Sequence, residues 1–452
     1  MISRLLLLGA TGDLAGRFLL PALAWRWSAG ELPDDLAVVG GGAEDWDDAT
    51  LGDHVAERWD AHAGALPAGL REGLREGLLP RLRYRRFDAG DPATVAAAVA
   101  AFDGAGPVAA YLALPPALFP PTLAALGTAR LPAGSRVAVE KPFGADLRTA
   151  VALNAQLAEV GGGEEAVTRV DHFLGMPAVA GLLALRSAGT PLAAAWHGRS
   201  LARVDVVWEE VLGLEGRAEF YDSTGAFRDV LQNHLFQVLV LLALELPPTG
   251  DDAALRTAKL ELLRSLRPFS PTDLAACTRR ARYTAGTLVG RAGAPDREVP
   301  DYTAEPGVDP DRGTETCAEI TLRADTPRWT GTTFRLRTGK ALGAPRKGIA
   351  LHFRGPAPDC DPRDAERVAE DQLWIPLEQP ARSDPGGGPQ ELTAYRRVLA
   401  DVLSGSSATS VGGPAAEQAW RVVDPVLAAW ATRAVPLLEY PAGSAGPPPL
   451  AG

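Results

Sequence analysis

The chain has 452 residues, of which 46% are hydrophobic and 22% are charged, and this length suffices for two domains with substantial cores. The formal net charge of −11 argues against nucleic acid as a partner, because no basic face is apparent to meet a phosphate backbone. The three cysteines are far apart, so neither a disulfide framework nor a thiolate metal site is indicated, and a reducing cytoplasm fits best. Since no uninterrupted apolar segment reaches about 18 residues, no membrane span is predicted.

The N-terminal segment predicts a dinucleotide site. Residues 4–8 are typical of a buried parallel strand, which leads directly into a glycine-containing turn and then a helix through residues 18–23. Backbone N–H groups at such a helix start bind a pyrophosphate, although two glycines alone could also form a structural tight turn. The candidate cofactor-binding residues in this turn are Gly9, Ala10, Thr11, Gly12, Asp13 and Leu14.

Further strands are predicted at residues 37–40, 108–113 and 136–140, with an amphipathic crossover at 94–102. The basic run Arg83–Arg86 is interpreted as a solvated strand edge. Two charged motifs, Glu140–Gly144 and Arg169–Gly175, follow probable strands at the sheet edge where open α/β sheets bind ligands.

A single histidine, His234, interrupts an otherwise apolar helical run that continues through residues 235–242. Imidazole exchanges protons near neutrality, so a histidine fixed on a rigid helix suits a general base. The alternative is a core histidine whose hydrogen bonds are satisfied.

Downstream, residues 252–266 predict a helix, and 318–323, 333–337 and 349–353 alternate as strands of a large antiparallel sheet do. We therefore predict an α/β Rossmann-like dinucleotide-binding domain over 1–175. An α+β domain with a mostly antiparallel sheet is predicted over 176–452. The Gly- and Pro-rich segments 384–389 and 444–452 are predicted loops or tail.

The order and spacing of these motifs resemble the glucose-6-phosphate dehydrogenase family over nearly the whole chain. The matching stretches are Gly9–Ala15, Tyr111–Pro116, Glu140–Gly144, Arg169–Gly175, Glu215–Arg217, Arg228–His234, Gly307–Glu315, Arg337–Lys340 and Tyr440–Ser444.

The resemblance implies hydride transfer from C1 of a hexopyranose to NAD or NADP, giving the 1,5-lactone. It implies that His234 is the catalytic base, that Asp171 orients it, and that Lys141 contacts substrate and cofactor beside a cis Pro142. It also implies a homodimer. The positions that it assigns to the sugar are Glu210, Asp229 and Lys340, with His172 on the substrate phosphate and Leu114 and Pro115 beside the cofactor.

Two departures from the family pattern stand out. Where the family has a tyrosine and a lysine that hold the 6-phosphate, this chain has Phe173 and Met176. Charge-assisted hydrogen bonds contribute about 1.5–3 kcal/mol each, so phosphate binding should weaken unless another arginine, such as Arg169 or Arg217, substitutes.

The second departure concerns the 2′-phosphate of NADP. The family's arginine after the second strand is missing, and Glu44 and Asp45 stand there instead. Acidic groups at this point repel a 2′-phosphate and accept hydrogen bonds from a ribose diol, which predicts NAD preference or dual use. Three hypotheses stay open: the family's own activity, a paralogue for a differently substituted sugar with NAD, and a catalytically silent relative.

Overall fold

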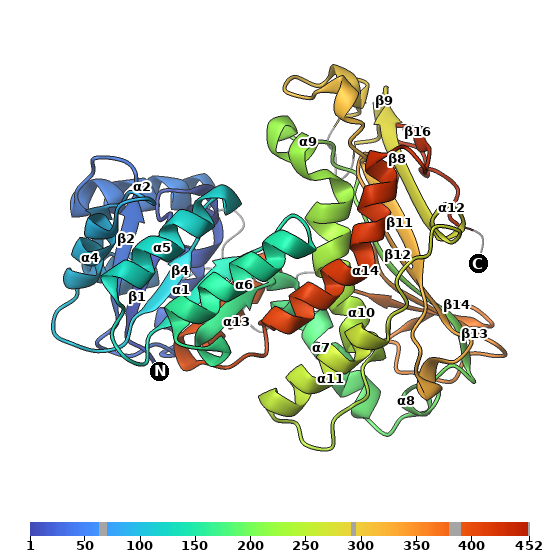
Figure 1. The fold of residues 1–452 in the computed structure, drawn as a ribbon, viewed down its shortest axis with the longest axis horizontal. Helices are drawn as coiled ribbons and strands as arrows, with labels where there is room; N and C mark the ends of the chain where they lie inside the picture. The colour runs from blue at the N-terminus through green and yellow to red at the C-terminus, as the bar shows by residue number, and fades with distance from the viewer. Residues whose placement is uncertain (63–69, 291–294, 379–389, 451–452) are drawn as a thin grey trace. The chain divides into compact units, whose positions relative to one another are not determined.

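The computed structural model describes residues 1–62, 70–290, 295–378 and 390–450 (Figure 1), so the predicted loop at 384–389 lies outside the described residues. The chain forms two compact units. The first comprises Met1–Ala180 and Gln379–Ala416, and the second comprises Gly181–Glu378 and Glu417–Gly452. The predicted boundary after residue 175 falls slightly earlier than this division, and the prediction did not include the return of the chain to the first unit.

The chain returns to the first unit because of the apolar face of α13 (Gln390–Ser404). Its apolar side chains recur at helical spacing, and Leu392, Val398 and Leu399 belong to the same buried core as Leu19 and Leu23. The sequence pattern predicts an amphipathic helix, but it does not specify which domain the apolar face covers.

The first unit is built on a six-stranded parallel sheet in the order β3-β2-β1-β4-β5-β6. Its strands are β1 (Arg4–Leu8), β2 (Ala37–Gly42), β3 (Leu82–Arg86), β4 (Ala109–Leu112), β5 (Arg136–Glu140) and β6 (Val167–Val170). The Rossmann-like prediction is confirmed, and the basic run 83–86 lies in β3 at one edge of the sheet.

Helices pack on this sheet because its central strands are apolar on both faces. In β1, Leu5 and Leu7 face the core shared with α1 and α13, and Leu6 and Leu8 are equally buried on the opposite side. The main helices are α1 (Leu20–Ser28), α2 (Asp48–His62), α4 (Pro92–Ala100), α5 (Phe119–Ala129), α6 (Leu147–Gly161) and α7 (Pro177–Ser187), which begins in the first unit and ends in the second.

The second unit contains an eight-stranded sheet in the order β14-β15-β13-β7-β12-β11-β8-β16. Its strands are β7 (Leu201–Glu209), β8 (Thr278–Thr284), β11 (Cys317–Leu322), β12 (Thr333–Gly339), β13 (Arg346–Phe353), β14 (Glu366–Ala369), β15 (Gln372–Pro376) and β16 (Leu437–Pro441). The mostly antiparallel sheet is confirmed. Two neighbouring pairs, β7 with β12 and β8 with β16, are parallel.

Helices line one side of this second sheet (Figure 1). The helical segment that carries His234 contacts β7, β11 and β12. The helices are α9 (Ala218–Ala226), η8 (Phe227–Leu235), α10 (Phe236–Ala243), α11 (Asp252–Ser265) and α14 (Gly413–Ala431), whose first residues belong to the first unit. A separate hairpin pairs β9 (Gly286–Leu288) with β10 (Arg297–Val299).

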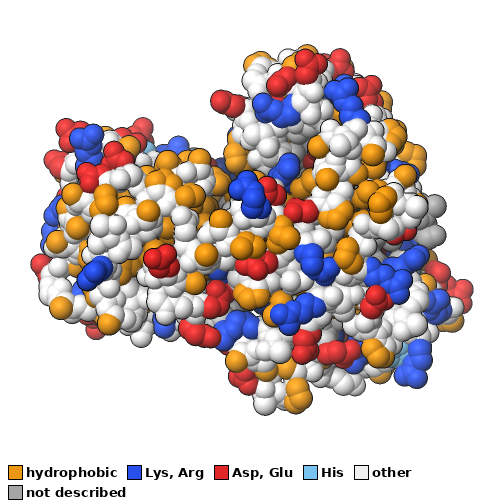
Figure 2. Space-filling view, in the orientation of Figure 1, with side chains coloured by type: hydrophobic (Ala, Val, Ile, Leu, Met, Phe, Trp, Pro, Cys, Tyr) orange, Lys and Arg blue, Asp and Glu red, His pale blue; other side chains and the backbone are white. Residues whose placement is uncertain are grey.

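On the face drawn in Figure 2, basic and acidic side chains are interspersed over both units. Within the ranges that the structure describes, no helix is both long enough and apolar enough to cross a bilayer.

Candidate functional site

The glycine turn after β1 has the geometry of a dinucleotide loop. Gly9 has a φ of +92°, and a Cβ atom there would lie 2.2 Å from the carbonyl oxygen of Ala113, so only glycine fits. The amides of Gly9 and Ala10 both donate to Gly41 O, at 2.8 and 3.0 Å, which fixes the loop to β2. The first helical bond after it runs from Gly16 N to Gly12 O at 3.1 Å, so the preceding amides at the helix start are oriented to bind an anion.

Glu44 lies beside this loop. A Cβ atom built at Gly42 would approach Glu44 Oε2 at 2.7 Å and Thr11 Cγ2 at 2.8 Å, so the carboxylate is next to the glycine turn. Leu114, after β4, also borders the loop, since its Cδ2 would lie 3.3 Å from a Cβ atom at Gly9. These residues fit a dinucleotide: close backbone approach, a helix start, and an acidic side chain at the end of β2.

Two arginines near the loop add positive charge. Arg17 and Arg58 both pair with Asp13, and the Arg17 contact is 3.2 Å. Arg58 comes from α2 and packs against Gly16. Arg58 was not predicted from the sequence, because no local pattern indicates that α2 passes this close to the turn.

Lys141, Asp171 and His172 follow strands β5 and β6, which are parallel neighbours, so all three lie at one sheet edge. The Lys141–Pro142 peptide is cis, as predicted. The Asp171 side chain is fully buried and accepts a hydrogen bond from Phe173 N at 3.0 Å, which caps the short helix η7 (His172–Gly175).

A buried acid lies under this edge. Glu140 accepts a hydrogen bond of 2.5 Å from the Tyr111 hydroxyl. Burial raises the pKa of Glu140 to about 7, against the opposing effects of the Tyr111 hydrogen bond and the Lys141 charge. Tyr395 from α13 also bonds Glu140 and stacks on His172 with ring centroids 5.2 Å apart. The returning helix therefore supplies a site residue, which the sequence motifs did not indicate.

The catalytic-base candidate stands on a π-helical turn. Segment η8 is π-helical over Phe227–Leu235, a form that is frequent at functional sites. Gly225 breaks the helix before it with a φ of +71°, and a Cβ atom there would lie 2.5 Å from Glu315 Oε1. Asn233 Nδ2 donates to Arg228 O at 2.6 Å, which satisfies a carbonyl within this turn. His234 is only 4% exposed, so the prediction of a buried histidine on a helix is confirmed.

Glu210 and Lys340 form an ion pair, with Nζ 2.8 Å from Oε2. They are brought together because β7 and β12 are parallel and in register, with Gly339 opposite Glu209. Asp229 lies on η8, which packs against β7 and β12, the two strands that end next to Glu210 and Lys340. The second unit thus pairs Glu210 with Lys340 and carries Asp229 on the helical segment that packs against the same two strands.

Tyr221 was not predicted from the sequence. It is 4% exposed, and within the described parts of the chain its hydroxyl has no hydrogen-bond partner. Lys340 Nζ lies 5.4 Å from its ring centroid, so the unpartnered hydroxyl belongs to the cluster of Glu210, Asp229 and Lys340. An unsatisfied buried hydroxyl costs free energy, which a ligand hydroxyl would offset.

The structure also limits which cation could replace the family's phosphate-binding lysine. Phe173 and Met176 are 5% and 3% exposed. Arg169, one candidate substitute, is fully buried and bonded to Glu164 and Asn154. The other candidate, Arg217, stacks over Phe220 in the second unit. Next to Met176, the exposed Arg397 donates from Nη1 to Gly175 O at 3.2 Å.

Both units match one protein family. Residues 6–180 match the glucose-6-phosphate dehydrogenase NAD binding domain, and residues 183–383 and 381–451 match the C-terminal domain of the same enzyme. Glucose-6-phosphate 1-dehydrogenase of Gluconobacter oxydans is 35% identical, covering 97% of this chain and 93% of its own. The enzyme of the same name from Treponema pallidum is 33% identical, covering 98% and 92%.

Solved structures agree with this assignment. Glucose-6-phosphate 1-dehydrogenase from Mycobacterium avium has a TM-score of 0.77 at 30% identity, covering 99% of this chain and 96% of that chain. A glucose-6-phosphate dehydrogenase in complex with glucose-6-phosphate has a TM-score of 0.81 at 26% identity, with the same coverage. The chain therefore belongs to the glucose-6-phosphate dehydrogenase family.

Proposed function

We propose that the chain oxidises C1 of glucose 6-phosphate to the 1,5-lactone, with NAD(P)⁺ as the hydride acceptor. The observation that carries this proposal is the cluster of Glu210, Lys340 and Asp229 beside the helix of His234. A charged and hydrogen-bonding cluster of this kind suits the hydroxyls of a sugar. The relatives named above act as glucose-6-phosphate dehydrogenases, and none of them favours a differently substituted sugar or a silent relative.

The roles proposed for the residues follow from their chemistry. His234 takes the proton of the C1 hydroxyl, so that the O–H bond breaks and a C1=O bond forms as hydride leaves C1. Asp171 orients the imidazole and stabilises its cationic form, and its own carboxylate is held by Phe173 N. Because Asp171 and His234 belong to different units, their pairing is part of the proposal. Lys141 would contact both substrate and cofactor.

For the cofactor, we propose that the glycine turn holds the pyrophosphate and that Glu44 binds the adenosine ribose of NAD. The bound dinucleotide supplies the hydride acceptor. A cation nevertheless lies near the end of β2, because Arg86 is the β3 residue opposite Gly42. The charge of Arg86 also lowers the pKa of Tyr84, although burial raises that pKa more strongly. The position of Arg86 therefore favours dual use of NAD and NADP as the alternative.

For the phosphate, we propose that His172 keeps the role that the resemblance implies and that Arg397 compensates for the missing tyrosine and lysine. The His172 ring is held by stacking on Tyr395, and the Arg397 guanidinium lies at the carbonyl of Gly175. We also propose a homodimer, by family resemblance, and a cytoplasmic location, in keeping with the unpaired Cys277, Cys317 and Cys360. Light scattering during size-exclusion chromatography tests the dimer.

The activity is tested by following reduced nicotinamide with NAD and NADP, each paired with glucose 6-phosphate and glucose. His234→Asn should lower kcat by about 10²–10⁴-fold, as loss of a general base does. The matched control is His54→Asn, a partly exposed histidine on α2 whose ring lies tilted against Trp46, with ring centroids 5.0 Å apart. A His234→Asn variant with wild-type turnover would refute the assigned base, and a wild type inactive with every pair would refute the activity.

A further inference from the structure

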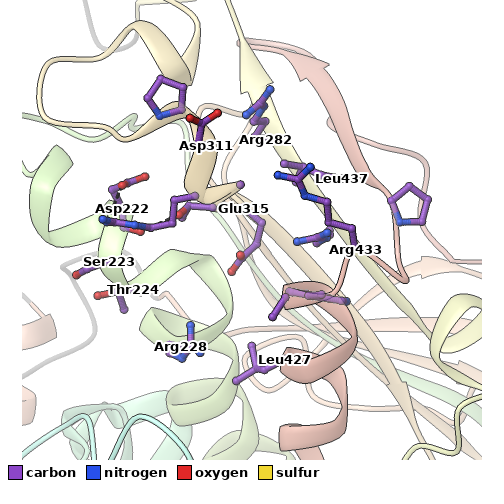
Figure 3. Close-up of a pocket in the computed structure, with 18 residues that line it drawn as sticks. Asp222, Ser223, Thr224, Arg228, Arg282, Asp311, Glu315, Leu427, Arg433 and Leu437 are labelled. Atoms are coloured by element: carbon purple, nitrogen blue, oxygen red, sulfur yellow. Dashed lines mark hydrogen bonds and ion pairs between the residues drawn. The ribbon is translucent and has the colours of Figure 1, made fainter.

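The second unit contains a cavity of about 610 Å³ that is separate from the cluster of Glu210 and Lys340. Its walls come from α9, the segment before β11, strand β8, and the end of α14 leading into β16. Figure 3 shows Asp222, Ser223 and Thr224 on one side and Arg433 and Leu437 on the other, with Glu315 between them. This volume is in the range of small-molecule binding sites.

Positive charge dominates the lining of this cavity. The guanidinium groups are those of Arg228, Arg280, Arg282, Arg312 and Arg433. The carboxylates are those of Asp222, Asp311 and Glu315. Such an excess of arginine is notable in a chain whose formal net charge is −11.

The carboxylates are largely engaged by other groups. Asp222 accepts from Arg312 at 2.8 Å and from the Tyr302 hydroxyl at 2.7 Å, so the Asp222 and Arg312 charges offset each other. Glu315 accepts from Phe227 N at 2.9 Å, and burial raises its pKa, an effect that the charges of Arg228 and Arg280 oppose. The Asp222 carboxylate is therefore engaged by Arg312 and Tyr302.

Two of those arginines, Arg280 and Arg433, line the same part of the cavity, because Arg280 is bonded to the segment that follows Arg433. Arg280 is 6% exposed and uses Nε to donate to Val435 O at 3.1 Å. Burial lowers the pKa of Arg280, the charge of Glu315 opposes this shift, and the charge of Arg433 adds to it. Within the described ranges, the Arg433 guanidinium makes no hydrogen bond or ion pair. Two guanidinium groups that line the same part of a cavity, one of them unpaired, form a site that an anion would stabilise.

We propose that this cavity binds a phosphate-bearing small molecule, with the phosphoryl group between Arg280 and Arg433. Guanidinium groups bind phosphate through paired charge-assisted hydrogen bonds, and more than one cation matches a dianion. The remainder of the ligand would lie along Leu427 and Leu437, which form an apolar part of the lining. A mononucleotide or a sugar phosphate fits this chemistry and this volume.

Binding is tested by isothermal titration calorimetry with the full chain and saturating NAD⁺, which occupies the dinucleotide site. The probes are AMP, ribose 5-phosphate and inorganic phosphate, with adenosine and ribose as unphosphorylated controls. AMP binding alone would identify a nucleotide site, and equal binding of AMP and ribose 5-phosphate would identify a general phosphate-ester site. The expected stoichiometry is one ligand per chain for at least one probe, with no binding of adenosine or ribose.

Arg433→Gln tests the assigned contact, because this exposed side chain can be changed without opening the core. The variant should weaken binding about tenfold, as loss of one charge-assisted hydrogen bond does. The matched control is Arg363→Gln, an arginine that is 88% exposed and pairs only locally with Asp361, and its affinity should not change. The proposal is overturned if no phosphate ester binds, if NAD⁺ abolishes binding, or if Arg433→Gln and Arg433→Glu bind as the wild type does.

Discussion

Lys340 and Glu210 are ion-paired across two neighbouring parallel strands, and each is the first residue after its strand. Their side chains are 16% and 21% exposed, so the pair is shielded but still accessible to a ligand. Parallel register brings these distant positions together. The same register would let one sugar hydroxyl contact both an ammonium and a carboxylate.

We predict that Lys340→Met lowers kcat/KM for glucose 6-phosphate by about 10²-fold, because a hydrogen bond to a charged group contributes about 1.5–3 kcal/mol. Glu210→Gln should lower it by a similar factor. Steady-state kinetics of both variants and the double variant form a cycle, and the double variant should lose less than the sum of the two. Strictly additive losses would mean that the pair does not act on the substrate as one unit.

We predict that Tyr221→Phe does not lower the free energy of unfolding and raises it by up to about 1–3 kcal/mol, because the variant removes a buried hydroxyl that has no partner within the described residues. The variant should raise KM for the sugar several-fold if the hydroxyl binds the substrate. Tyr302→Phe is the matched control, since its hydroxyl bonds Asp222 at 2.7 Å. The control should lose about 1–2 kcal/mol of stability and keep its KM. The opposite pattern would remove Tyr221 from the site.

Elements with a strong local signal could be predicted from the sequence. Strands 4–8 and 136–140 coincide with β1 and β5, because both are short apolar runs buried on two faces. The parallel pairing of β7 with β12 could not be predicted, because alternation along one strand does not specify the direction of its neighbour. The packing of α13 in the first unit could not be predicted either, because an amphipathic pattern does not specify which domain the apolar face covers.

The site residues also divide into those that a local motif indicates and those that depend on long-range contacts. Glycines, strand-end charges and His234 were identified because each stands in a local motif. Tyr221 and Arg58 were missed because their roles depend on which distant residues they contact. The π-helical form of η8 was not predicted either, since its hydrophobic pattern reads like that of an α-helix.

Glu140 gives a prediction on pH dependence. Its folded-state pKa of about 7 lies above the ordinary value of 4.5, so the folded protein binds this proton more tightly than the unfolded chain does. The contribution to stability is therefore present below about pH 4.5 and is lost as pH rises toward 7, by at most about 3 kcal/mol. Denaturant midpoints of wild type and Glu140→Gln between pH 5 and 8 should show a fall in the wild type that the variant lacks. Parallel pH profiles would mean that the folded-state pKa is not raised.

Glu44 and Arg86 should have opposite effects on cofactor choice. Glu44→Ser removes a charge that repels the 2′-phosphate, so kcat/KM with NADP should rise about tenfold or more relative to NAD. Arg86→Gln should lower NADP use without affecting NAD, because only NADP offers the extra phosphate. Kinetics with both cofactors at one sugar concentration measure the ratio. An unchanged ratio in both variants would place 2′-phosphate recognition elsewhere.

Met176→Lys restores the cation that the family has at this position. Glucose 6-phosphate should then show a KM at least about tenfold lower, whereas KM for glucose should not change, because only the phosphate gains a charge-assisted hydrogen bond. Since Met176 is 3% exposed, the variant should also lose about 1–3 kcal/mol of stability, and Met176→Leu serves as the control that preserves packing. If Met176→Lys leaves KM unchanged while Arg397→Gln raises it, the phosphate is held by the arginine at the Gly175 carbonyl, and the missing lysine has already been replaced.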